Sequence, residues 1–204
     1  MKKTVQDLLN NARSWGHSEP HIHWPVDIGK IRDKVVLDLG CGSDGYKNQE
    51  PWISTPEYWS TMGPKKIIGV EPSLDDINFI TTRLNDVFSD GKFELVNDMI
   101  TSSEQISNLI EQHNVNFVKS DIETGERHFL NVSDEIFSKV DDYIIEVHDD
   151  SKLELNDTIV YRLIDKLYRC NYSVYDIATF AWHPMNHAGT DNWNIWLVFA
   201  EKNK

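Results

Sequence analysis

The sequence predicts an α/β fold, a seven-stranded, mostly parallel sheet with helices on both faces. Three observations support this prediction. Short runs rich in Val and Ile alternate with longer stretches whose apolar residues recur at helical spacing. A glycine-rich turn follows the first of the short runs. The chain has 204 residues and is 40% apolar, which is enough to build one hydrophobic core.

Seven short runs are expected to form the strands of the sheet. Helical stretches separate most of them, and this alternation is typical of parallel strands joined by helices. The expected strands cover residues 34–39, 66–70, 92–96, 115–120, 142–148, 172–178 and 194–200.

Three apolar stripes at steps of three and four residues predict helices between the strands. Ser73, followed by Asp75 and Asp76, resembles an N-cap with acidic residues in the first turn. The stripes consist of Ile77, Ile80, Leu84 and Val87, of Phe129, Ile136, Phe137 and Val140, and of the apolar pairs from Ile159 to Tyr168.

The whole chain, residues 1–204, is expected to form a single domain. Its first 30 residues are irregular and rich in His, Trp and Pro, so we expect residues 1–30 to be an extension that packs over the domain. No apolar stretch follows Lys2 and Lys3, and no later run is long enough to span a membrane. Two cysteines do not indicate a disulfide framework. The cytoplasm is therefore the expected compartment.

The charge of the chain restricts its partners. Twenty Lys and Arg stand against 33 Asp and Glu, a formal net charge of −13. A field of that sign repels phosphate backbones and anionic membrane surfaces. We therefore expect neither a nucleic acid nor a membrane as a partner.

A glycine-rich turn follows the first expected strand. Gly40, Gly42 and Gly45 match the G-x-G-x-x-G pattern of a Rossmann-like, nucleotide-binding turn. Glycine is also common in tight turns for steric reasons alone, so a purely structural role is an alternative.

The carboxylates around this turn help to choose its ligand. Asp38 precedes the turn and Asp44 lies within it. Negative charge there disfavours a pyrophosphate but suits a ligand that carries a sulfonium and an ammonium group. Glu71, at the end of the second strand, can accept both ribose hydroxyls. The interval from Asp38 to Glu71 is longer than the roughly 20 residues typical of nicotinamide sites, which argues against such a site. An NAD-dependent oxidoreductase is nevertheless kept as the alternative.

Residues 36–42 (VLDLGCG) and 69–73 (GVEPS) resemble motifs I and II of the class I methyltransferases that use S-adenosylmethionine. The resemblance implies that the glycine turn packs against the methionine part of this cofactor, with Asp38 near it. It further implies that Glu71 holds the ribose diol and that Asp98 meets the adenine amino group. The cofactor-binding residues that it implies are Asp38, Gly40, Cys41, Gly42, Glu71, Pro72, Asp98 and Ser120.

Two later segments resemble a narrower family, the FkbM-type methyltransferases. Residues 117–126 (FVKSDIETGE) and 143–148 (YIIEVH) match its Lys-x-Asp-x-Glu-Gly-x-Glu and Glu-x-His patterns, and the resemblance covers roughly residues 35–150. Thr124 stands where the family has glycine. The resemblance implies O-methylation of a hydroxyl on a small molecule or glycan.

Asp121, Glu146 and His148 are the expected catalytic residues. They fall at the carboxyl ends of adjacent expected strands, where open α/β sheets bind ligands. Residues 146 and 148 of one strand point the same way. A histidine near its reference pKa of about 6.5 is a suitable base for a hydroxyl acceptor. The alternatives are a structural histidine at a strand end, and simple helix or loop acids at Glu126 and Glu123.

No metal is assigned from the sequence. Asp121, Glu123, Glu146 and His148 form a set of hard ligands, which leaves a divalent cation as an alternative. The chain lacks the Asp-Asn pair of the catechol-type, metal-dependent methyltransferases. Two other histidine pairs have ligand-like spacing, His21 with His23 and His183 with His187, and both are expected in surface loops. Pro184 makes a regular helix turn between His183 and His187 unfavourable.

Tryptophans in the segments Trp15–Trp24 and Trp182–Trp193 are expected to pack loops onto the sheet, with an acceptor pocket as the alternative. Outside the enzymes, a Rossmann-like module that binds the cofactor without turnover is a further alternative. It predicts that His148→Ala leaves biological activity intact.

Overall fold

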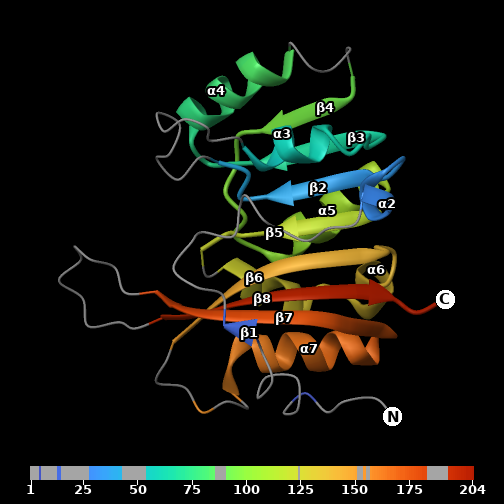
Figure 1. The fold of residues 1–204 in the computed structure, drawn as a ribbon, viewed down its shortest axis with the longest axis vertical. Helices are drawn as coiled ribbons and strands as arrows, with labels where there is room; N and C mark the ends of the chain where they lie inside the picture. Colours follow the sequence, from blue (N-terminus) through green and yellow to red (C-terminus); the bar gives the residue numbers. More distant parts are fainter. Residues whose placement is uncertain are drawn as a thin grey trace.

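A mixed β-sheet forms the centre of the computed structural model (Figure 1). The structure describes residues 5, 13–14, 28–42, 54–85, 91–123, 125–150, 154, 157–182 and 193–204. The strands are β1 (Arg13–Ser14), β2 (Val35–Leu39), β3 (Lys66–Val70), β4 (Phe93–Val96), β5 (Phe117–Ser120), β6 (Asp142–Asp150), β7 (Tyr172–Trp182) and β8 (Trp193–Lys202).

The strand order is β1-β7-β8-β6-β5-β2-β3-β4. The seven expected strands, β2 to β8, are all present, and the two-residue β1 adds to them at one edge. Neighbours from β6 to β4 pair in parallel, whereas β8 is antiparallel to both β6 and β7. The sheet is therefore mixed, because β7 and β8 follow each other along the chain and pair as an antiparallel hairpin.

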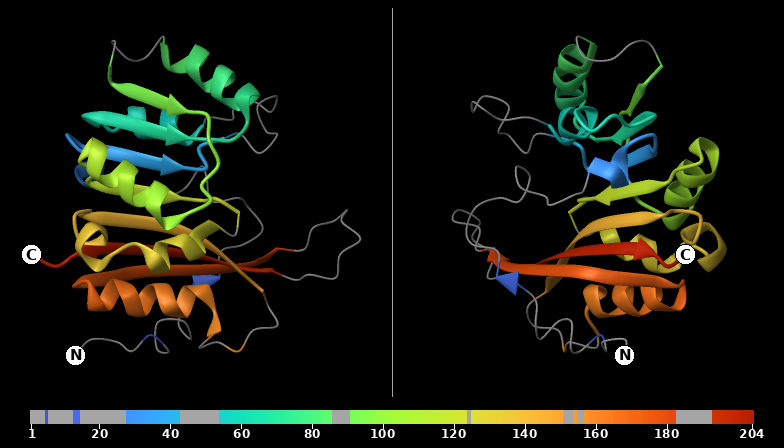
Figure 2. Two further views of the ribbon diagram at one scale, coloured as in Figure 1. Left: turned by 180° about the vertical axis from the view of Figure 1, so that it is seen from behind. Right: turned by 45° about the vertical axis from the view of Figure 1, so that its right-hand side comes forward.

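Helices cover both faces of the sheet (Figure 2). One face carries α5 (Ser103–His113), the 3₁₀ helix η3 (Gly125–Asn131), α6 (Asp134–Phe137) and α7 (Ile159–Arg169). Their buried residues join one large core with β2, β5 and β6. On the opposite face lie α2 (Ile28–Ile31), α3 (Thr55–Ser60) and α4 (Leu74–Asn85). Ile31 and Trp59 pack there against Val36 and Phe117.

Two of the three expected helices are confirmed as α4 and α7, and Val87 of the first stripe lies outside the described residues. The stripe from Phe129 to Val140 is not one helix, because Ser133 caps a new helix by accepting a hydrogen bond from Ile136 N. The sequence analysis did not anticipate α5. Its signal is a capping box, in which Ser102 and Gln105 satisfy each other's backbone N–H groups.

Strand alternation places a row of polar side chains on the face that α2, α3 and α4 cover. Leu37 and Leu39 point into the large core, so Asp38 between them points to the other face. Lys119, the neighbour of Asp38 in β5, shares that face. Glu146 and His148 are two residues apart in β6, so both side chains lie on this face as well.

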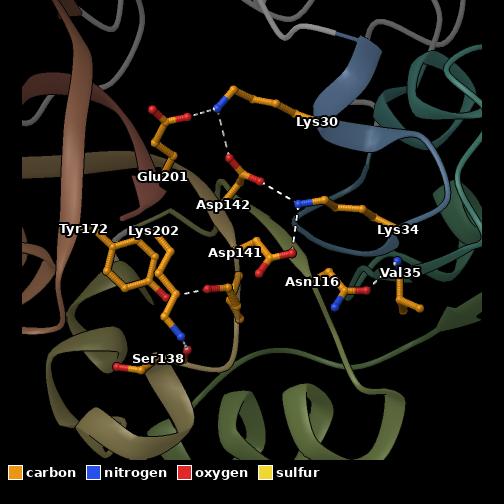
Figure 3. A network of polar contacts seen from close by, with 11 residues as sticks. Lys30, Lys34, Val35, Asn116, Ser138, Asp141, Asp142, Tyr172, Glu201 and Lys202 are labelled. Carbon is orange, nitrogen blue, oxygen red and sulfur yellow. Dashed lines mark hydrogen bonds and ion pairs between the residues drawn. The ribbon is translucent and has the colours of Figure 1, made fainter. Parts of the chain in front are cut away.

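A polar network ties α2 to the amino-terminal edge of the sheet (Figure 3). Lys30 and Lys34 donate hydrogen bonds to the two carboxylate oxygens of Asp142 at 3.1 and 2.8 Å. Lys30 also contacts Glu201 in β8. The network joins three segments that lie far apart in the sequence. Asp142 at its centre is buried.

Within the described residues, we find no helix with the length and apolarity needed to cross a membrane. The prediction that residues 1–30 pack over a single domain stays a prediction. Of that segment the structure describes Val5, β1 and the start of α2, and β1 pairs with β7.

Candidate active site

A cavity of about 540 Å³ opens at the carboxyl ends of the parallel strands. Its volume falls in the range of small-molecule sites. The strand order reverses direction between β2 and β5, and open α/β sheets bind their ligands at such a switch point. The lining includes Gly40, Glu71, Pro72, Asp98, Asp121 and Glu123.

Gly40 stands where the loops after β2 and β5 touch. Its φ is +70°, and a Cβ there would lie 1.6 Å from the carbonyl oxygen of Asp121. At Gly42, a Cβ would lie 2.4 Å from Oε2 of Glu71. Gly40 therefore excludes a side chain, and at Gly42 the backbone of the turn passes directly beside the Glu71 carboxylate, which a side chain there would displace.

Glu71 and Asp98 follow β3 and β4 and line the cavity. Oε1 of Glu71 accepts a hydrogen bond from Ser73 N at 2.8 Å, which orients a carboxylate that is almost fully buried. Asp98 is exposed, and its Oδ2 accepts a hydrogen bond from Gln105 Nε2 at 3.1 Å. Both acids are thus held in place at the ends of neighbouring strands.

Asp38 lies beneath the glycine turn rather than in the cavity. It is fully buried, and its Oδ2 accepts a hydrogen bond from Trp59 Nε1 at 2.8 Å. Lys119 Nζ lies 3.3 Å from its other oxygen and donates to the carbonyl of Gly40 at 2.6 Å. Asp38 therefore supports the turn from below, and its expected place near the cofactor stays a prediction.

Lys119 is the lysine of the Lys-x-Asp pattern, but no role at the site was predicted for it from the sequence. Burial lowers the pKa of its ammonium, but the charges of Asp38 and Asp121 outweigh burial and hold the pKa above that of a free lysine. The signal in the sequence was a lysine inside a short strand that is otherwise buried on both faces. Arg127 and His128, which also line the cavity, gave no pattern in the sequence.

Of the expected cofactor-binding residues, Cys41, Gly42 and Ser120 do not line the cavity, and their contact with the cofactor stays a prediction. Cys41 is fully buried against Ile80 and Leu84 of α4, and burial raises the pKa of its thiol. Ser120 is fully buried, and its hydroxyl has no hydrogen-bond partner among the described residues. Strand alternation and the tight turn direct both side chains into packed regions.

Asp121, Glu146 and His148 converge, as the sequence analysis expected. One oxygen or nitrogen atom of each lies within 4.8 Å of the others. Nε2 of His148 lies 3.6 Å from Oε1 of Glu146 and 3.8 Å from Oε2 of Glu123. Nδ1 lies 3.4 Å from Oε1 of Glu126. Glu126 lies in the first turn of η3, as the helix-acid alternative expected, and it is fully buried.

The surrounding carboxylates set the protonation of this cluster. Burial lowers the pKa of His148, but the hydrogen bond with Glu126 and the charges of Glu126, Asp121 and Glu146 raise it to about 9. Burial, with the charge of Asp121, raises the pKa of Glu146 well above its usual value. The surrounding carboxylates therefore favour the protonated imidazole, whereas the sequence led us to expect a base near its reference pKa, and the catalytic role of His148 stays a prediction.

Several expectations from the sequence lie outside the described residues or side chains. They concern Asp44 and Gly45 of the glycine pattern, Thr124, the pairs His21 with His23 and His183 with His187, and the tryptophans of the segments Trp15–Trp24 and Trp182–Trp193.

Solved structures similar to this chain include methyltransferases. A provisionally assigned RNA methyltransferase from Pyrococcus horikoshii has 17% identity and a TM-score of 0.50, and the match covers 98% of each chain. A provisionally assigned S-adenosylmethionine-dependent methyltransferase from Listeria monocytogenes has 14% identity and a TM-score of 0.49, over 86% of this chain and 92% of that one. M. capricolum TrmK, solved with S-adenosyl-homocysteine, has 14% identity and a TM-score of 0.48, over 87% and 66%.

No family model matches the sequence, and no curated protein matches it. The match to the P. horikoshii protein extends over nearly the whole of both chains, at an identity that establishes a shared fold and nothing finer. The chain thus has the α/β fold of the class I methyltransferases, with a mixed sheet.

Proposed function

We propose that this chain is an S-adenosylmethionine-dependent methyltransferase that methylates a hydroxyl oxygen on a small molecule or glycan. The observation that carries this proposal is the cavity where Gly40, Glu71 and Asp98 meet at the ends of three neighbouring parallel strands. The backbone of the glycine turn lies there beside an oriented carboxylate, and a Cβ at Gly40 would collide with the carbonyl of Asp121.

The residues of the cavity fit this cofactor. Glu71 and Asp98 line the cavity, and we expect Glu71 to accept hydrogen bonds from the ribose hydroxyls and Asp98 from the adenine amino group. Acidic side chains of Glu71, Asp98, Asp121 and Glu123 line the cavity together with one arginine, Arg127, and one histidine. Such a lining favours a ligand with sulfonium and ammonium charges over the pyrophosphate of NAD.

Asp121 is placed to act on the acceptor. The cofactor, when bound, supplies an electrophilic methyl group. The acceptor hydroxyl must lose its proton, and Asp121 is the member of the Asp121–Glu146–His148 cluster that lines the cavity. Its carboxylate can accept a hydrogen bond from the hydroxyl and then its proton. Positioning of the hydroxyl by the rest of the cluster supplies further rate.

The choice of a hydroxyl acceptor rests on the FkbM-type pattern and on charge. The pattern consists of Lys119 in β5, Asp121 and Glu123 just after this strand, and Glu146 and His148 in β6. The acids beside the cavity and the net charge of −13 oppose a phosphate backbone. Although the similar P. horikoshii protein carries an RNA methyltransferase assignment, a nucleic-acid acceptor is the contrary outcome of the test below.

Glu71→Ala is expected to weaken binding of S-adenosylhomocysteine at least tenfold. Hydrogen bonds to a charged group contribute about 1.5–3 kcal/mol, and about 1.4 kcal/mol is tenfold in affinity. Isothermal titration of the wild type and the variant measures this. Glu135→Ala, which removes an exposed acid on α6 outside the cavity lining, is the matched control and should bind like the wild type. Binding of NAD alone would favour the oxidoreductase, and binding of neither ligand would favour a scaffold.

Asp121→Asn is expected to slow methyl transfer by about 10²-fold or more, the scale for losing a general base. Affinity for S-adenosylhomocysteine should stay within a few fold, because the amide keeps the shape of the side chain. Transfer of labelled methyl from S-adenosylmethionine to a panel of hydroxylated glycans and phenols, with total tRNA as a competing acceptor, measures this. Transfer to tRNA alone would contradict the proposed acceptor.

A further inference from the structure

The ends of β5 and β6 bring together three side chains that bind metals. Asp121, Glu146 and His148 each offer one ligand atom, and these atoms lie within 4.8 Å of one another. First-row cations hold nitrogen and oxygen ligands at about 2.0–2.2 Å, so two ligand atoms on one ion stand about 3–4.2 Å apart. Nε2 of His148 and Oε1 of Glu146 are 3.6 Å apart, within this range. An inward movement of the Asp121 carboxylate would complete the set around an ion.

Glu146 supplies an independent sign of a missing partner. Its side chain is 7% exposed, and its Oε2 is buried without a hydrogen-bond partner among the described residues. Oε2 of the fully buried Glu126 likewise has no hydrogen-bond partner among the described residues. A buried carboxylate oxygen is costly unless a hydrogen bond, a counter-charge or a metal satisfies it.

Carboxylates outnumber bases in the cluster. Asp121, Glu126 and Glu146 place three buried or nearly buried carboxylates around one imidazole. Lys119 lies 4.0 Å from Asp121, but it lies closer to Asp38 and to the carbonyl of Gly40. Buried charges in proteins are paired or coordinate metals, so a divalent cation bound here would take the place of protons on these carboxylates and on the imidazole.

Glu126 orients His148 as the outer partner of a metal-bound histidine does. Its Oε1 lies 3.4 Å from Nδ1 of His148 and also accepts a hydrogen bond from Ile122 N at 3.0 Å. A proton fixed on Nδ1 leaves Nε2 as the ligand atom, and Nε2 faces Glu146 and Glu123. Histidines that bind metals regularly donate their other N–H to a carboxylate in this way.

We propose that Asp121, Glu146 and Nε2 of His148 bind one divalent first-row cation, with Glu123 as a further ligand on the solvent side. Mixed imidazole and carboxylate donors favour ions such as Mn²⁺, Fe²⁺ or Zn²⁺ over Mg²⁺ and Ca²⁺, which prefer oxygen. Asp121 and Glu123 line the cavity, so the ion reaches it. There it can bind the acceptor hydroxyl and lower the pKa of that hydroxyl, a role that rests on the proposed function.

Titration of the full chain with Mn²⁺, after treatment with a chelator and dialysis, tests the site. Electron paramagnetic resonance follows the loss of the free Mn²⁺ signal. We expect one saturable site in the micromolar range. Glu146→Gln and His148→Gln should weaken it at least tenfold, and Glu126→Gln about 10–100-fold, as removal of an outer partner does. His113→Gln is the control and should leave the affinity for Mn²⁺ unchanged. This histidine lies outside the cluster, with its Nδ1 3.9 Å from Oε2 of Glu94.

A second measurement does not depend on variants that fold. Electron spin echo spectra of Mn²⁺ bound to the wild type should show coupling to an imidazole nitrogen. No saturable binding up to 1 mM, roughly the limit of weak sites, would overturn the proposal. So would binding without nitrogen coupling, or binding equal in Glu146→Gln, His148→Gln and the wild type. Because S-adenosylhomocysteine binding is measured separately, Mn²⁺ binding without cofactor binding would refute the proposed function and keep the cation site.

Discussion

Replacing Lys119 with methionine is expected to destabilise the fold by about 3–5 kcal/mol, the usual effect of removing one partner from a buried ion pair. The ammonium lies 3.3 Å from the fully buried Asp38 and 2.6 Å from the carbonyl of Gly40. Its loss leaves a buried carboxylate without its counter-charge, although Trp59 Nε1 still donates a hydrogen bond to it at 2.8 Å. Domains are stable by about 5–15 kcal/mol, so much of the total would be lost.

Urea unfolding followed by circular dichroism measures the free energy of unfolding of Lys119→Met. The double variant Asp38→Asn/Lys119→Met should recover part of the loss, because it removes the charge that the single variant leaves unpaired. Lys139→Met removes an exposed lysine that pairs with Glu111 and should change little. If Lys119→Met were as stable as Lys139→Met, the buried pair would not hold the turn.

Gly40→Ala is expected to abolish measurable binding of S-adenosylhomocysteine and to destabilise the fold by about 2–4 kcal/mol. The new Cβ would lie 1.6 Å from the carbonyl oxygen of Asp121, so the loops after β2 and β5 must separate. A residue other than glycine at this φ costs about 1–2 kcal/mol, and overpacking adds about 1–3 kcal/mol. Isothermal titration and urea unfolding measure the two effects.

Gly63→Ala is the matched control for this substitution. Gly63 has a φ of +72°, close to that of Gly40, but a Cβ there would meet no atom within 4 Å. It should therefore show only the conformational cost, about 1 kcal/mol, with unchanged ligand affinity. Equal behaviour of the two alanine variants would mean that the contact between the loops is not needed for the cavity.

The strands were the most predictable part of the fold. The run from Lys66 to Val70 coincides with β3, because a strand buried on both faces is a short unbroken apolar run in the sequence. The helices were less predictable. Phe129 and Phe137 enter the same core from two separate helices, so an apolar stripe alone did not reveal the break at Ser133.

The cluster at the carboxyl edge was predictable in its position but not in its chemistry. Strand ends and alternation were enough to bring Asp121, Glu146 and His148 together. The protonation of His148 depends on Glu126, which comes from a 3₁₀ helix 22 residues away in the sequence. The support that Lys119 gives to Gly40 also depends on packing between strands, which no local pattern encodes.

The place of β8 sets an order on assembly. Its residues Trp193–Lys202 lie between β6 and β7 and pair with both, so those two strands share no direct pairing. On the ribosome, β6 and β7 are made before the strand that joins them, and β6 keeps an open edge until residue 202 has emerged. Unpaired edges invite association with other chains. Chaperone protection of the nascent chain should therefore matter most in the interval between residues 150 and 202.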